Sequence, residues 1–117
     1  MKATKKIYGI ALALACCISP TLKGQNLIYV ANDAGLNTIG EYTDSGSTVN
    51  ASLITGLLSP YGIAISGNDL FVANYLGYTV GEYTTSGSTI NASLIGGLGS
   101  PYNVAISGND LFVADAG

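Results

Sequence analysis

The sequence contains no histidine, no arginine and no tryptophan. Its only lysines are Lys2, Lys5, Lys6 and Lys23, and its only cysteines are Cys16 and Cys17. From residue 25 onward the chain therefore lacks every imidazole, thiol and amine side chain. Within that segment these absences exclude a Ser-His-Asp triad, a thiolate enzyme, a Schiff-base enzyme and a zinc site built from His or Cys ligands.

Positive charge is confined to the first 23 positions, and all seven acidic residues come later. A segment without Lys or Arg cannot neutralise phosphates, so we expect no binding to nucleic acid or to an anionic membrane surface. Carboxylate and amide oxygens remain and can bind Ca²⁺ or Mg²⁺. The sequence has neither an EF-hand spacing nor a Gly-Gly-x-Gly-x-Asp repeat. We therefore predict no metal and no other cofactor.

The N-terminus has the pattern of a secretory signal peptide. Three lysines precede the apolar run at residues 7–19, and Pro20 ends that run. The run is too short to span a bilayer as a helix, so we predict a signal peptide at residues 1–24 and no transmembrane segment in the mature chain. Cleavage would place the protein outside the cell, in the periplasm or at the cell surface. A lipid anchor at Cys16 is the alternative, because Ala13-Leu14-Ala15-Cys16 resembles a lipobox.

The rest of the chain is an internal repeat. SGNDLFVA occurs at residues 66–73 and again at 107–114. When residues 38–76 are aligned with 79–117, 29 of the 39 pairs are identical. A partial third copy begins earlier, where NLIYVAN at 26–32 matches NDLFVAN at 68–74. A period of 41 residues is typical of solenoids, propellers and repeat arrays.

Each period has the pattern of four short strands rather than of helices. The predicted strands lie at residues 61–66, 69–74, 78–84 and 88–95. Residues 69–74 form a continuous apolar run, as in a strand covered on both faces. Gly67 and Asn68 fit a two-residue hairpin turn, because glycine readily supplies the positive φ that such a turn needs. The sequence thus predicts an all-β fold made of four-stranded antiparallel units.

A family resemblance follows from these residues. The pattern PYGIAISGNDLFVAN at 60–74 resembles the NHL type of β-propeller repeat, and the continuation GEYTTSGSTINASLI resembles NHL-like repeats of secreted bacterial proteins. The resemblance covers residues 26–117 and implies propeller blades of four antiparallel strands. It divides residues 25–117 into a partial blade at 26–59, a full blade at 60–100 and a partial blade at 101–117.

A closed propeller needs about four to eight blades, so the blades counted here form an incomplete ring. Three explanations stay open. The first, which we favour, is that the chain is a fragment whose repeats continue past Gly117. The second is that the chain is complete and copies of it assemble into a homo-oligomeric ring. The third is a different stacking of the strands, such as a β-solenoid.

Differences between the copies indicate a candidate recognition face. Apart from Ile/Val exchanges, six of seven differences fall in or beside two connections that leave an antiparallel blade on the same side. Such loop faces commonly bind partners. The candidate residues are Asn32, Asp33, Tyr61, Asn74, Tyr75, Tyr102, Asn103 and Asp115. The alternative is sequence drift in loops that tolerate change.

We therefore expect an exported, non-enzymatic β-propeller module that binds or scaffolds a protein or an extracellular carbohydrate. The second interpretation is part of a metal-dependent lactonase-like or hydrolase-like propeller, whose catalytic residues lie outside this chain. The propellers that resemble gluconolactonase hold a divalent metal with Glu, Asp and Asn, but no such motif can be matched residue by residue here.

Overall fold

The computed structural model describes residues 26–117. The predicted signal peptide at residues 1–24 lies outside the described residues. The described part of the chain forms nine β-strands and one short 3-10 helix. In chain order these elements are β1 (Leu27–Asn32), β2 (Thr38–Thr43), β3 (Thr48–Ile54), β4 (Pro60–Ser66), β5 (Asp69–Asn74), η3 (Tyr75–Gly77), β6 (Thr79–Thr84), β7 (Thr89–Ile95), β8 (Pro101–Ser107) and β9 (Asp110–Asp115).

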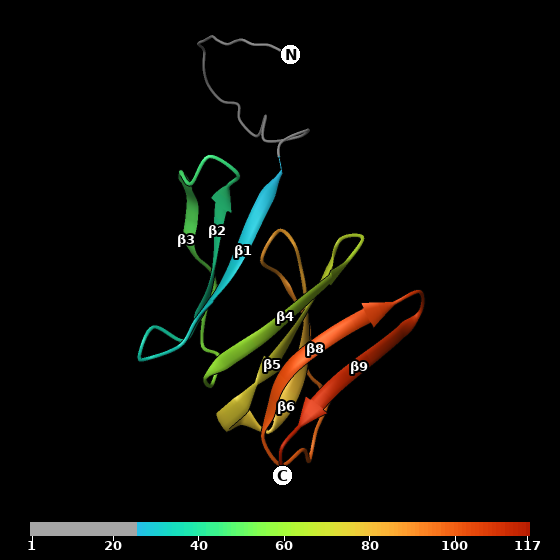
Figure 1. Cartoon of the computed structure of the whole chain (residues 1–117). Helices are drawn as coiled ribbons and strands as arrows, with labels where there is room; N and C mark the ends of the chain where they lie inside the picture. Colours follow the sequence, from blue (N-terminus) through green and yellow to red (C-terminus); the bar gives the residue numbers. More distant parts are fainter. Residues whose placement is uncertain (1–25) are drawn as a thin grey trace, which may run out of the picture.

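The strands pair antiparallel, each with its neighbour in the chain, and form three sheets (Figure 1). The first sheet has the order β1-β2-β3, the central sheet β4-β5-β6-β7 and the third sheet β8-β9. None of these sheets closes on itself. The prediction of an all-β, antiparallel fold is therefore confirmed.

The central sheet follows the sequence pattern closely. In β5, Leu70, Val72 and Ala73 are fully buried, as expected of a strand covered on both faces. Gly67 has φ +60° in the turn between β4 and β5, so the predicted hairpin is confirmed. The third predicted strand began one residue too early. Tyr78 adopts a left-handed conformation with φ 58° after the helix η3, so β6 begins at Thr79.

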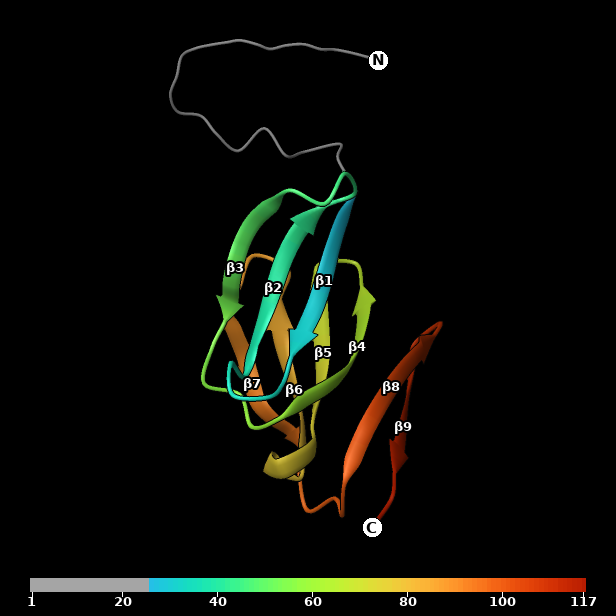
Figure 2. The same ribbon diagram turned by 60° about the vertical axis from the view of Figure 1, so that its left-hand side comes forward.

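The three sheets stack in chain order, with β4 in contact with both β1 and β8 (Figure 2). We call the side of the central sheet that carries Leu70 and Val72 its front face. The side that carries Phe71 and Ala73 is its back face, and repeat-equivalent residues define the same faces on the other sheets. One apolar cluster joins the first sheet to the front face of the central sheet. A second cluster joins the back face of the central sheet to the third sheet.

The central and third sheets approach one another closely at Gly62 of β4. A Cβ atom at Gly62 would lie 2.5 Å from the Cα atom of Asn103 in β8. Real Cβ atoms do not come that close to backbone, so only glycine allows this separation of the two sheets. Asn103 occupies the equivalent position one repeat later. The contact between the two sheets therefore explains why position 62 is glycine although the next copy has asparagine there.

Replacement of Leu70 by Ala should lower the free energy of unfolding by about 2–5 kcal/mol, because it empties a fully enclosed site. The matched control is Leu111→Ala, which changes the same residue of the next repeat where the side chain is only partly buried. We expect a clearly smaller loss there. Urea unfolding followed by circular dichroism measures both, and equal losses would contradict the burial pattern.

Replacement of Gly62 by Ala should cost about 1–3 kcal/mol, because the added methyl group overpacks the contact with Asn103. Gly96→Ala is the control, since no atom lies within 4 Å of a Cβ built there and its φ is not positive. Thermal unfolding of both variants tests the close approach. A Gly62→Ala variant as stable as Gly96→Ala would show that the sheets are not held at this distance.

Candidate functional site

The connections between strands divide into two groups at opposite ends of the sheets (Figure 2). The tight hairpin turns lie at one end, which we call the turn end. The connections at residues 33–37, 55–59, 75–78 and 96–100 lie at the other end, which we call the loop end. Backbone hydrogen bonds tie neighbouring connections together there. Tyr75 N donates to Ser59 O at 2.9 Å, and Leu98 N donates to Tyr78 O at 3.1 Å.

Three predicted recognition residues gather at the loop end. Tyr61 opens β4, and Tyr75 begins η3. Their ring centroids lie 5.0 Å apart with an interplanar angle of 27°, which is a stacked pair. Tyr61 is 47% exposed, so the pair is accessible to solvent. The nearby negative charge of Asp33 raises the pKa of the Tyr61 hydroxyl, which places the carboxylate beside this pair.

Tyr102 and Asn103 repeat the positions of Tyr61 and Gly62 in the third sheet. Tyr102 is also exposed, but Ala116 occupies the position equivalent to Tyr75, so no second stacked pair forms within residues 26–117. Asn103 Oδ1 accepts a hydrogen bond from Val104 N at 3.0 Å. Its backbone packs on Gly62. Tyr102 and Asn103 therefore do not reproduce the aromatic pair that Tyr61 and Tyr75 form.

The side chains of the other predicted residues form hydrogen bonds within the chain. Asn32 Nδ2 donates to Thr38 Oγ1 at 3.2 Å, and Asn74 Nδ2 makes the equivalent bond to Thr79 Oγ1 at 3.4 Å. Asn74 is only 4% exposed, so its amide is not offered to a ligand at the surface. Among the described residues, its Oδ1 is the one buried side-chain polar atom without a hydrogen-bond partner.

Asp115 takes the place of Asn74 one repeat later and stabilises the connection at residues 96–100. Its carboxylate accepts hydrogen bonds from Gly99 N at 2.9 Å and from Ser100 N at 2.5 Å. These backbone donors hold the pKa of Asp115 below its usual value, and the hydrogen bond from Gly99 N has the largest effect. An acid with a lowered pKa stabilises the fold above its unfolded-state pKa of about 3.8, and this contribution disappears as the pH falls through the folded-state value.

The burial of Glu41 and its pairing with Tyr29 were not predicted from the sequence. Glu41 in β2 is only 7% exposed, and burial raises its pKa. It pairs across the strands with Tyr29 of β1, whose hydroxyl donates to Thr85 O at 3.3 Å and so bridges the first and central sheets. Burial and the charge of Glu41 raise the pKa of Tyr29. The repeat alignment contained a signal, because Tyr29 stands where the other copies have phenylalanine.

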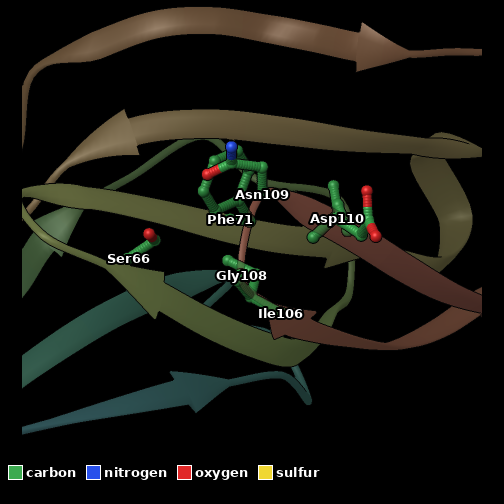
Figure 3. A pocket seen from close by; sticks show the side chains of 7 residues that line it. Ser66, Phe71, Ile106, Gly108, Asn109 and Asp110 are labelled. Carbon is green, nitrogen blue, oxygen red and sulfur yellow. The ribbon is translucent and has the colours of Figure 1, made fainter.

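A small pocket opens at the turn end, between the central and third sheets (Figure 3). Phe71 and Leu111 line it from the two sheets, together with the polar residues Ser66, Asn109 and Asp110. No motif in the sequence indicated this pocket. It lies at the opposite end of the sheets from the Tyr61–Tyr75 pair, so the two features are separate.

Within residues 26–117, no group of three or more His, Cys, Asp or Glu side chains is placed to hold a metal ion. In the same part of the chain, no helix has the length and apolar character needed to cross a membrane. Comparison of the chain with protein-family models, curated proteins and solved structures gives no match.

Replacement of Glu41 by Gln should raise the free energy of unfolding at neutral pH. The raised folded-state pKa means that the folded chain holds this proton more tightly than the unfolded chain does. Glu41 therefore destabilises the wild type once the pH exceeds the unfolded-state value of about 4.5, and this cost grows until the pH passes the folded-state pKa. Below pH 4.5 the two proteins should converge.

The matched control is Glu82→Gln at the equivalent position of β6, where the side chain is only partly buried. Urea unfolding across the acidic and neutral range should show the gain for Glu41→Gln and little change for Glu82→Gln. A loss of stability for Glu41→Gln at neutral pH would mean that its charge is compensated in the folded state.

Proposed function

We propose that the chain is built of NHL-like β-propeller repeats and acts outside the cell as a non-enzymatic module that binds or scaffolds a partner. Three features support the architecture: the 41-residue repeat, the four strands of the central sheet paired in chain order, and the face-to-face stacking of successive sheets. The lysines and the apolar run of the N-terminus support export.

The observation that carries the binding function is the stacked pair Tyr61–Tyr75 with the Asp33 carboxylate beside it. Binding sites typically combine aromatic surface with a few polar groups that orient the ligand. The exposed ring of Tyr61, which stacks on the partly buried ring of Tyr75, can contact the apolar face of a sugar, and a carboxylate can accept hydrogen bonds from sugar hydroxyl groups. This chemistry favours an extracellular carbohydrate over a protein partner.

The charge of the segment narrows the ligand class. From residue 25 onward the chain has seven carboxylates and no cationic side chain. An anionic polysaccharide would be repelled by these carboxylates and would find no side-chain cation to pair with. The charge of the segment therefore disfavours anionic polysaccharides, and we propose an uncharged polysaccharide as the ligand to test first.

Affinity electrophoresis of the full chain in gels that contain uncharged polysaccharides tests this function. We expect retention by at least one polysaccharide and a loss of about tenfold in affinity, or roughly 1.4 kcal/mol, for Tyr75→Ala. That substitution gives the loop the alanine that the chain itself has at position 116. Tyr102→Ala is the control and should leave retention unchanged, since Tyr102 has no stacking partner among the described residues.

Retention that is unaffected by Tyr75→Ala would reject the tyrosine pair as the binding site. No retention in any polysaccharide gel would reject the carbohydrate ligand.

A further inference from the structure

The connections that precede β4 and β8 are equivalent segments of successive repeats, but one backbone N–H group has different partners in them. Before β8, Ser100 N donates to the carboxylate of Asp115 at 2.5 Å. Before β4, Ser59 N donates to Asn37 Oδ1 at 3.3 Å, in the neighbouring connection of the first sheet. Asn74 stands where Asp115 stands one repeat later, yet it does not receive this hydrogen bond.

The observed direction of the Ser59 N–H group carries two costs. Ser59 has φ 53°, a left-handed conformation that is unfavourable for serine, whereas Ser100 has no positive φ. The Oδ1 atom of Asn74 is buried without a hydrogen-bond partner, which lowers the stability of the fold. Both costs disappear if the Leu58–Ser59 peptide group turns over and directs its N–H group at Asn74.

Two hydrogen bonds hold the observed direction of this peptide group. Its N–H group donates to Asn37 Oδ1, and its carbonyl oxygen, Leu58 O, accepts from Leu76 N of η3 at 3.1 Å. In the next repeat Tyr78 takes the place of Asn37, with the same left-handed conformation but without a side-chain amide. The direction of the peptide group therefore depends on competition between the amides of Asn37 and Asn74.

The same peptide group is bonded to the helix η3, which begins with Tyr75 (Figure 2). When the peptide group turns over, Leu58 O leaves Leu76 N, so η3 loses this bond to the neighbouring connection. The arrangement found before β8 also displaces η3. A Cβ atom built on Gly99 overlaps the Cα atom of Gly117, which is the equivalent of Leu76. Because leucine stands at position 58, the two directions of the peptide group require two positions of η3.

We propose that this peptide group is a two-state switch that regulates the binding site at the loop end. With its N–H group on Asn37, η3 is held in place and Tyr75 stacks on Tyr61. With its N–H group on Asn74, η3 moves and the tyrosine pair separates. A ligand that binds the pair selects the first state, because it binds that state more tightly. The link to a ligand rests on the proposed carbohydrate function, whereas the switch itself does not.

Asn37→Gly tests the switch, because it removes the competing amide and glycine tolerates the φ of 55° at this position. We expect the peptide group to turn over. Ser59 then loses its positive φ, and with it the strong nuclear Overhauser effect between its amide proton and its own Hα. The Leu76 amide should exchange with solvent about tenfold faster, because its hydrogen bond is lost. Ala34→Gly is the control and should change neither signal, since Ala34 has the same φ in the same connection but no side-chain amide.

Retention of the same variants in the polysaccharide gels tests the link to the ligand. Asn37→Gly should weaken binding about fivefold, because about one fifth of the molecules then hold η3 in place. Addition of Ser59→Gly should restore most of the affinity, since glycine removes the cost of the left-handed φ and favours the observed direction. A residue that only stabilises the connection would not be rescued in this way.

An unchanged φ at Ser59 and an unchanged exchange rate at Leu76 in Asn37→Gly would overturn the switch. Asn74→Asp gives the same test if Asn37→Gly does not fold, because a carboxylate there attracts the N–H group as Asp115 does. A reversed peptide group with unchanged retention would overturn the link to the ligand alone. If no polysaccharide retains the wild type, the carbohydrate function is rejected and the magnetic resonance result alone decides the switch.

Discussion

The structure depends on one constraint, which is that the second strand of each repeat is apolar on both sides. Leu70 and Val72 point to one face of the central sheet, while Phe71 and Ala73 point to the other. A sheet of this kind is stable in water only when another layer covers each face. The stacking order of the sheets, the close approach at Gly62 and the two apolar clusters all follow from this requirement.

The order of the strands in the sheets gives the molecule two different ends. Because every strand pairs with its neighbour in the chain, the hairpin turns collect at one end and the longer connections at the other (Figure 2). The turn end is nearly identical in each copy. At the loop end, by contrast, Tyr75 in one copy corresponds to Ala116 in the next. Most of the differences between the copies therefore lie in the longer connections, and Gly62/Asn103 is the one that the packing between sheets explains.

Much of the fold could be predicted from the sequence, because the repeat shows the strand pattern of one unit more than once. The hairpin at Gly67 and the burial of Leu70 followed directly from local patterns of glycine and apolar residues. The helix η3 was not predicted, since the left-handed conformation of Tyr78 depends on the neighbouring connection and not on its own preference. Local pattern and tertiary context therefore determine different parts of this chain.

The sequence indicated the candidate residues but not the contacts that their side chains make. Differences between the copies directed attention to the loop end, where Asp33, Tyr61 and Tyr75 come together. The same comparison could not distinguish a side chain that faces solvent from one that holds the loop in place. Asn74 and Asp115 belong to the second kind, and their roles depend on hydrogen bonds that only the three-dimensional arrangement reveals.

The Gly62–Asn103 difference has a consequence for folding. The hairpins that contain residues 66–73 and 107–114 share these eight residues, so each offers the same backbone and nearly the same side chains to a neighbouring strand. A chain with such copies risks a swap in which one hairpin takes the place of the other. Asn103 in the position of Gly62 would bring a side chain against the backbone of the next sheet. That single glycine therefore favours the correct order of two almost identical hairpins as the chain folds.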